Sequence, residues 1–299
     1  MAASASSGTD PTEHAVESEL SEPATELPGS AEPEVTAELK LPARRRHLLK
    51  PVLAILGVCA LLGVVVVAAL TRDGSNGSDK PRKPRFTVAA LTPKPGSVVP
   101  HKAAPVPARL TEWSAGIAER TDIPARVVQA YGRAEQKMRG LDPRCGISWA
   151  TLAGLGRVES SHGEYGGSEV RPDGTLSKPI IGVALDGHEG VLAIKDTDGG
   201  ELDGDPKWDR AVGAMQFVPA TWHKWAMRAS GDGRDPDPQN VDDAALTSAR
   251  YLCGTGGDLS TPSGWWHGVL TYNKSVSYGR KVFSGADAYA RVNVAAAAG

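Results

Sequence analysis

The feature that most constrains this chain is an unbroken run of 20 apolar residues at 51–70, which contains no charged side chain. As a helix with a rise of 1.5 Å per residue, such a run crosses the roughly 30 Å hydrocarbon core of a bilayer. The run begins after 50 residues, which is too far into the chain for a cleaved signal peptide. We therefore predict a single uncleaved transmembrane helix over residues 47–70.

The charges before this run determine the expected orientation. Residues 1–39 contain nine Asp and Glu residues and no Lys or Arg, whereas Arg44, Arg45 and Arg46 lie just before the run. The positive-inside rule places this basic cluster in the cytoplasm. We expect residues 1–46 to form a disordered acidic cytoplasmic tail with a basic end, because their composition buries too little apolar surface to fold. The chain after residue 70 is then extracytoplasmic and faces the cell wall.

Residues 71–109 are rich in Pro, Lys and Arg, which predicts a semi-extended extracytoplasmic linker. The linker could be a plain spacer, or its basic residues could favour anionic wall polymers or lipid headgroups. From residue 110 the composition is that of a globular domain, which we assign to 110–299. The formal net charge of −2 gives no basis for nucleic-acid binding, and no motif identifies a protein partner.

The domain is predicted to be mainly α-helical with long loops, because no segment shows convincing strand alternation. The stretch 164–207 is rich in Gly, Asp and Pro and is predicted to be one long loop. Helices are expected at 110–120, from an N-cap at Asp122 to Met138, at 147–163, from Pro219 onwards, and at 242–252.

Glu159 is the candidate catalytic residue. In the helix predicted over 147–163 it projects within roughly 20° of Leu152, on the apolar stripe. A carboxyl group there loses solvent, which favours its acid form and suits a general acid. The alternative is a partly buried Glu that forms a salt bridge with an Arg such as Arg157. We expect Gly163 to be the left-handed residue that ends the helix.

The loop contains the acidic run Asp196, Asp198, Asp203 and Asp205. Spaced carboxylates among glycines can bind calcium, although the spacing does not complete an EF-hand, and Asp-Gly turns are the commoner reason for such a run. No metal or other cofactor is otherwise required by any motif.

Two further features concern the same half of the chain. In an oxidising compartment, Cys145 and Cys253 are predicted to form a disulfide, whereas Cys59 lies in the apolar run. Gln216 offers an amide between Met215 and Phe217, which suits a sugar hydroxyl or N-acetyl group unless the backbone satisfies that amide.

Four motifs occur in a fixed order: Glu159-Ser-Ser-His-Gly163, Gly213-Ala-Met-Gln-Phe-Val-Pro219, Ser230-Gly-Asp-Gly233 and Tyr272-Asn-Lys-Ser275. Together, over about residues 110–295, they resemble the lytic murein transglycosylase B family in its membrane-anchored actinobacterial branch. The resemblance implies a lysozyme-like helical domain with a cleft for peptidoglycan glycan strands. It also implies that Glu159 is the single catalytic acid, with the cleft lined by Gln216, Tyr272 and Asn273. Met215 and Phe217, which flank Gln216, are the further candidate binding residues, as the apolar wall beside that amide.

The chain departs from the family pattern in two places. Arg228 stands where better-known members have an Asp that opens a calcium loop, so no metal is assigned to the Ser230-Gly-Asp-Gly233 segment. The segment between Glu159 and Gln216 also differs, which leaves the far side of the cleft undefined. Asp209 is the best candidate in that segment for a second catalytic carboxylate.

The resemblance implies cleavage between N-acetylmuramic acid and N-acetylglucosamine, with capture by the C6 hydroxyl to give a 1,6-anhydro end. Such chemistry needs one carboxyl group rather than the usual pair of a glycosidase. The alternatives are a hydrolytic muramidase on the same scaffold and a non-catalytic peptidoglycan-binding protein.

Overall fold

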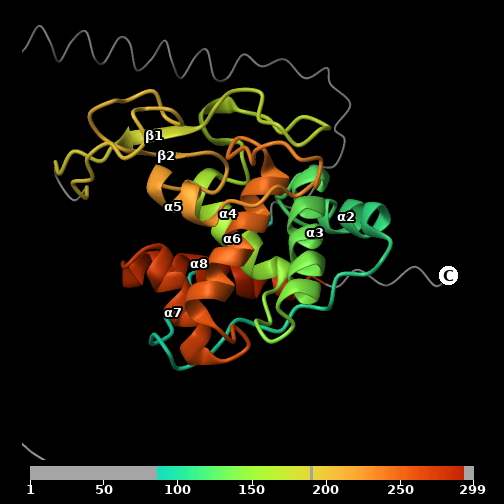
Figure 1. Cartoon of the computed structure of the whole chain (residues 1–299). Helices are drawn as coiled ribbons and strands as arrows, with labels where there is room; N and C mark the ends of the chain where they lie inside the picture. Colours follow the sequence, from blue (N-terminus) through green and yellow to red (C-terminus); the bar gives the residue numbers. More distant parts are fainter. Residues whose placement is uncertain (1–85, 189–190, 293–299) are drawn as a thin grey trace, which may run out of the picture. The chain divides into compact units, whose positions relative to one another are not determined.

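The computed structural model describes residues 86–188 and 191–292 (Figure 1). The predicted tail, transmembrane helix and first part of the linker lie outside these residues. Within the described part, no helix combines the length and the apolar character needed to cross a bilayer.

The described residues are mainly helical, as predicted. They also contain two short strands that the sequence did not indicate: β1 lies within the expected loop of 164–207, and β2 lies just after it. Strands β1 and β2 pair antiparallel, with Ile181 opposite Val212. They escape prediction because each has only three or four residues and β1 contains Gly and Ala. In chain order the elements are α2 Leu110–Ala118, α3 Ala125–Leu141, α4 Trp149–Ser160, a 3₁₀ turn at Tyr165–Gly167, β1 Ile181–Ala184, β2 Arg210–Val212, α5 Pro219–Trp225, α6 Val241–Gly256, α7 Pro262–Tyr272 and α8 Val276–Ala290.

Helix α3 begins after Pro124, which occupies the N-cap position without a side-chain hydrogen bond. The prediction that Asp122 caps this helix is therefore wrong. Its carboxylate instead pairs with Arg157 and accepts a hydrogen bond from Tyr289. An ion pair and a buried phenol compete successfully for this carboxylate, because charge-assisted hydrogen bonds are the stronger ones.

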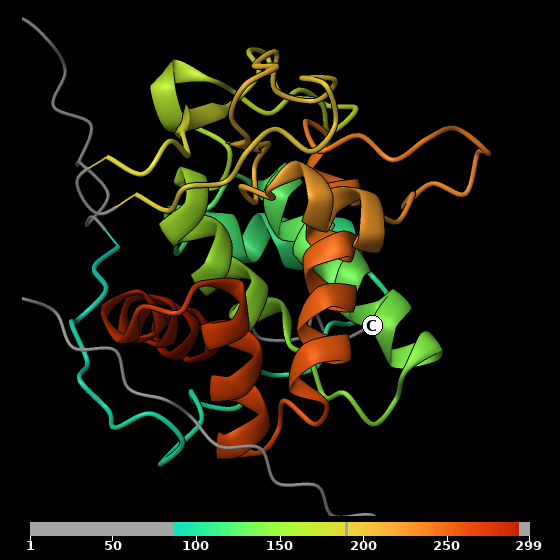
Figure 2. The same ribbon diagram turned by 60° about the vertical axis from the view of Figure 1, so that its left-hand side comes forward.

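Helices α4 and α8 pack against each other at very short range (Figures 1 and 2). The contact is made by glycines: Gly154 of α4 faces the α8 backbone, and Gly285 of α8 lies against Gly154. A Cβ at Gly154 would come within 2.7 Å of the backbone nitrogen of Ala286. Small residues therefore set the distance between these two helices.

This close approach predicts that Gly154→Ala destabilises the protein by about 1–3 kcal/mol, because backbone atoms of α8 cannot move away cheaply. Gly140→Ala is the matched control. Gly140 lies in the last turn of α3, and a Cβ added there would have no atom within 4 Å, so alanine should stabilise by up to about 1 kcal/mol. Thermal unfolding of both variants measures the difference, and equal melting temperatures would contradict the packing.

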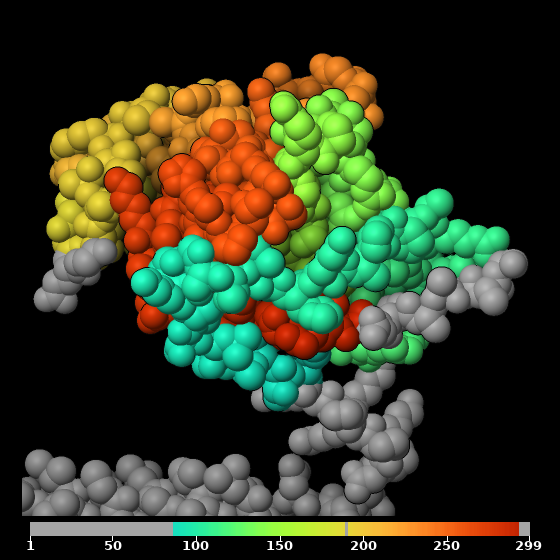
Figure 3. Space-filling model, turned by 90° about the horizontal axis from the view of Figure 1, so that it is seen from below, coloured from blue at the N-terminus to red at the C-terminus, as the bar shows by residue number. Residues whose placement is uncertain are grey.

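Residues 86–109, which we name the strap, are the described part of the predicted linker, and they pack on the domain. The strap runs across the domain surface (Figure 3). Leu91 N donates to Ser284 Oγ at 2.9 Å, Trp266 Nε1 donates to the Val98 carbonyl at 2.9 Å, and Val106 is only 4% exposed. Prolines pre-set an extended backbone, which lowers the entropy cost of laying such a segment on the domain.

The predicted disulfide between Cys145 and Cys253 is confirmed. It joins the segment before α4 to α6 across 108 residues of sequence, and both cysteines are buried. The start of the helix that carries Glu159 is therefore tied covalently to a neighbouring core helix.

Candidate active site

Glu159 lies in the last turn of α4, and the local sequence explains why the helix ends there. Ser148 caps the start by accepting a hydrogen bond from Thr151 N, and Leu152 and Leu155 are fully buried. The helix ends at Ser160, and the first left-handed residue is Ser161 with φ of 51°, rather than the expected Gly163. His162 N closes the end by donating to the Gly156 carbonyl, six positions back, at 2.9 Å, which satisfies one of the terminal carbonyls of the helix.

The Glu159 carboxyl is half-buried, and Tyr278 Oη of α8 donates a hydrogen bond to its Oε1. Burial raises the pKa of Glu159 to about 7, and the hydrogen bond from Tyr278 works in the opposite direction. The alternative salt bridge to Arg157 is wrong, because Arg157 pairs with Asp122. Glu159 thus holds its proton to near-neutral pH, as a general acid must.

This raised pKa predicts a pH-dependent stability. Between about pH 4.5 and 7 the unfolded chain releases the Glu159 proton while the folded chain keeps it, so unfolding becomes easier as pH rises. Glu159→Gln removes that effect. The variant should exceed the parent in unfolding free energy by roughly 1–2 kcal/mol at pH 8, allowing for residual solvent contact, and by much less at pH 5. Urea unfolding at both pH values measures this, and a constant difference would contradict it.

Two tyrosines interact with the acid, Tyr278 through a hydrogen bond and Tyr272 through electrostatics. Burial, followed by the nearby Glu159 charge, raises the pKa values of Tyr272 and Tyr278 well above the ordinary value, so both phenols stay protonated. Tyr272 Oη donates to the Met215 carbonyl at 2.6 Å. The structure therefore brings the predicted Tyr272 within electrostatic range of Glu159, although its hydroxyl is occupied by the backbone.

Gln216 adopts an unusual backbone conformation, with φ of 50°. Its Nε2 donates to the Gly213 carbonyl at 2.9 Å, so the backbone satisfies one end of the amide, and its Oε1 faces Gly182 of β1. Non-glycine residues with positive φ carry strain and concentrate at functional sites. Gln216 also borders a cavity of about 60 Å³ lined by Gln216, Phe217, Val218, Thr221, Tyr251 and Tyr272.

The other predicted binding residues have mainly structural surroundings. Met215 is 1% exposed and contributes its backbone carbonyl rather than its side chain. Phe217 is 2% exposed and packs between the rings of Trp222 and Tyr272. Asn273 is exposed at the end of α7, where its Oδ1 accepts a hydrogen bond from Ser275 N. These contacts do not join Asn273 to Glu159.

Sequence reasoning missed Tyr278 and the burial of His162. His162 is 2% exposed and lies between two tyrosine hydroxyls. Tyr278 follows the Tyr272 motif closely in sequence, which was the available signal. The break between α7 and α8 hid the direction of its side chain, because helical spacing does not continue from Tyr272 to Tyr278.

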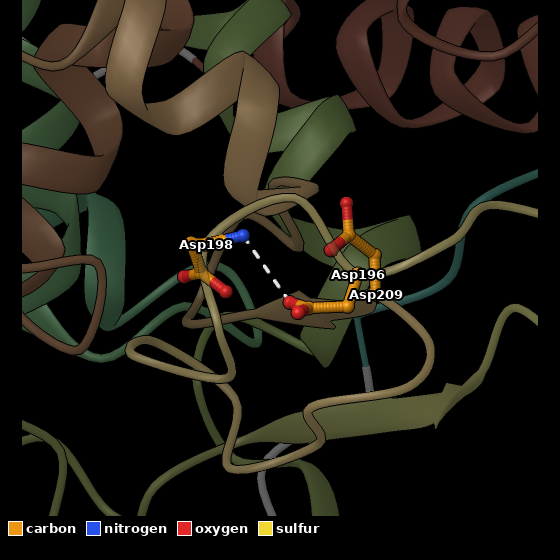
Figure 4. A group of neighbouring side chains, drawn as sticks. All are labelled: Asp196, Asp198 and Asp209. Carbon is orange, nitrogen blue, oxygen red and sulfur yellow. Dashed lines mark hydrogen bonds between the residues drawn. The ribbon is translucent and has the colours of Figure 1, made fainter.

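The acidic loop has a different grouping from the predicted one. Carboxylate oxygens of Asp196, Asp198 and Asp209 lie within 4.8 Å of one another (Figure 4). Asp203 and Asp205 accept hydrogen bonds from Arg210 instead, through its backbone and its guanidinium respectively. Oxygen ligands of this kind suit a hard cation, but backbone N–H groups already satisfy Asp196 and Asp198 in Asx turns.

Asp209 belongs to this loop rather than to the surroundings of Glu159. It is fully buried and accepts hydrogen bonds from Thr197 N at 2.9 Å and Thr197 Oγ1 at 2.8 Å. A structural role in folding the loop therefore accounts for this carboxylate, and its contacts do not support the second catalytic role considered from sequence.

Arg228, which stands where the family pattern has an Asp, interacts with two acidic residues near the Ser230-Gly-Asp-Gly233 segment. Its guanidinium forms ion pairs with Asp232 at 2.8 Å and with Asp243 at 2.7 Å. Asp243 is 1% exposed, so its charge requires a partner. At this turn the Arg228 guanidinium therefore neutralises the carboxylates of Asp232 and Asp243, as a bound cation would.

The chain was compared with protein families, curated proteins and solved structures. No family model and no curated protein matches the chain. Among solved structures, the chain is similar to the Escherichia coli lytic transglycosylase Slt35 in complex with bulgecin A, with 14% sequence identity and a TM-score of 0.32. The match covers 62% of this chain and 79% of that chain. A TM-score this low supports no conclusion about family or activity.

Proposed function

We propose that residues 86–292 form the catalytic domain of a peptidoglycan lytic transglycosylase. The observation that carries the proposal is a single carboxyl group, Glu159, whose pKa is about 7 and whose hydrogen-bond partner is a tyrosine rather than a second carboxylate. The ordered sequence motifs supply the substrate class. We further propose that residues 47–70 anchor the chain in the cell membrane, so that this domain remodels glycan strands of the wall.

In the proposed reaction, protonated Glu159 donates its proton to the oxygen between N-acetylmuramic acid and N-acetylglucosamine as that bond breaks. The ionised carboxylate then takes the proton of the C6 hydroxyl, whose oxygen bonds to C1 and forms the 1,6-anhydro ring. Tyr278 favours the ionised state because it donates a hydrogen bond to the carboxylate. The scheme uses no metal and no second carboxylate.

Mass spectrometry of the products tests the proposal. Sacculi digested with the protein should release muropeptides that end in 1,6-anhydromuramic acid. Products heavier by one water would establish a hydrolytic muramidase instead. Binding of sacculi without release of soluble fragments would establish a non-catalytic wall-binding protein.

Tyr278→Phe should lower kcat by about tenfold or more, because a hydrogen bond to the charged carboxylate is lost. Loss of this bond also raises the Glu159 pKa, so activity should persist to higher pH before it falls. A kcat-against-pH profile measures both effects. Tyr165→Phe is the control, since that phenol is 66% exposed. A Tyr278→Phe profile identical to the parent would contradict the assigned role.

A further inference from the structure

The segment directly after Glu159 contains three consecutive residues in the left-handed region. Ser161, His162 and Gly163 have φ values of 51°, 63° and 86°, and the first two are not glycine. Such a conformation persists only where surrounding contacts hold it. Ser160 Oγ provides part of that support by accepting a hydrogen bond from Gly163 N and donating one to the Ala214 carbonyl.

The rest of the support comes from the buried imidazole of His162. Its Nδ1 lies 3.1 Å from Tyr131 Oη of α3, and its Nε2 lies 2.9 Å from Tyr289 Oη of α8. Gly156 makes room for this arrangement, because a Cβ there would overlap the Tyr131 hydroxyl. Phe86 of the strap stacks on the Tyr289 ring with centroids 5.1 Å apart. His162 therefore joins the end of α4 to two other helices.

The direction of each hydrogen bond follows from the chemistry of the partners. Tyr289 Oη has one proton and donates it to the Asp122 carboxylate at 2.7 Å. It must therefore accept from His162, which places the imidazole proton on Nε2. The bare Nδ1 then accepts the proton of Tyr131 Oη. Burial lowers the pKa of His162 to about 4, in keeping with a neutral ring.

These contacts join the C-terminal end of α4, and the turn that follows it, to α8 at two places. Glu159 meets Tyr278 near the start of α8, and His162, three residues later, meets Tyr289 near its end. A shift of the turn at 161–163 would move the last turn of α4 and change how far the Glu159 carboxyl lies from water.

We propose that His162 is a positioning residue: its neutral imidazole, held between Tyr131 and Tyr289, fixes the left-handed turn that keeps Glu159 half-buried against Tyr278. The claim that His162 supports catalysis rests on the proposed function. The claim that His162 holds the turn next to Glu159 does not depend on any activity.

The test is a direct titration of Glu159 by ¹³C NMR of the full chain labelled at glutamate Cδ, with Glu159→Gln identifying the resonance. The parent should titrate near pH 7. His162→Asn should titrate about one pH unit lower, because the carboxyl becomes better hydrated. Asn tolerates the left-handed region, so the substitution removes the bridge without adding backbone strain. Tyr131→Phe, which removes one end of the bridge, should shift the midpoint in the same direction.

His267→Asn is the control, since that side chain is exposed on α7. An unchanged Glu159 midpoint in both His162→Asn and Tyr131→Phe would overturn the proposal. If either variant fails to fold, ¹⁵N NMR of His162 in the parent still decides. The Nε2–H tautomer, neutral at pH 6, is expected, and an imidazolium or the Nδ1–H tautomer would overturn it.

Activity separates the two proposals. With His162→Asn, kcat for glycan release should fall about tenfold while KM stays unchanged. A shifted Glu159 midpoint in a parent that cleaves no glycan would refute the proposed function alone. A parent that cleaves glycan, with both variants unaffected in midpoint and kcat, would refute the positioning role alone.

Discussion

Glu159→Gln is expected to reduce glycan cleavage by about 10³-fold or more. Gln has nearly the shape of the protonated carboxyl but can neither donate a proton to the glycosidic oxygen nor take one from the C6 hydroxyl. Since the proposed scheme uses this one group for both transfers, no other acid replaces it. Release of soluble muropeptides from sacculi, followed by chromatography, measures the loss.

Glu164→Gln is the matched control, because this exposed carboxyl lies only five residues further along the chain. The control should retain the parent rate. Glu159→Gln should still bind sacculi, because the substitution leaves the surrounding aromatic residues in place. Cleavage by Glu159→Gln at the parent rate would show that Glu159 is not the acid, whatever else lines the site.

Loss of the Cys145–Cys253 disulfide is expected to lower the free energy of unfolding by about 2–5 kcal/mol. The bond closes a segment of 108 residues, so its absence greatly enlarges the set of unfolded conformations. The double variant Cys145→Ser, Cys253→Ser measures the effect in urea unfolding. Both cysteines are buried, so the introduced hydroxyls also need partners and should add to the loss.

Reduction supplies the control for this experiment. A reductant should lower the melting temperature of the parent towards that of the double variant and leave the double variant unchanged. A parent that melts at the same temperature with and without reductant would contradict a stabilising disulfide. The bond ties the start of α4 to α6, and α4 carries Glu159. In the double variant, activity should therefore be lost over the same range of denaturant concentration in which α4 unfolds.

Features that depend on a few neighbouring residues were predictable. Apolar residues at helical spacing predicted α4 and placed Glu159 on its buried face, and Pro219 marked the start of α5. The oxidising compartment inferred from the apolar run predicted the disulfide. Each of these rests on local periodicity or composition, which a sequence displays directly.

The differences between the predictions and the structure also have physical reasons. The strap has the composition of a linker, yet it is held by hydrogen bonds to helices nearly 200 residues away, such as the one from Leu91 to Ser284. Asp122 has the position of a helix cap, yet the stronger partners Arg157 and Tyr289 take its carboxylate. Local sequence propensity indicates which conformations and partners are possible for a segment, and tertiary contacts determine which of them forms.

Local patterns were enough to predict a helical domain, an acid on the apolar face of α4 and a disulfide just before that helix. That Tyr278 is the partner of the acid, and that His162 is buried between two tyrosines, follows from tertiary packing alone. These contacts join residues 119 and 127 positions apart along the chain. They depend on how closely α4 and α8 approach each other, which the packed glycines of both helices set, and no local pattern encodes that distance.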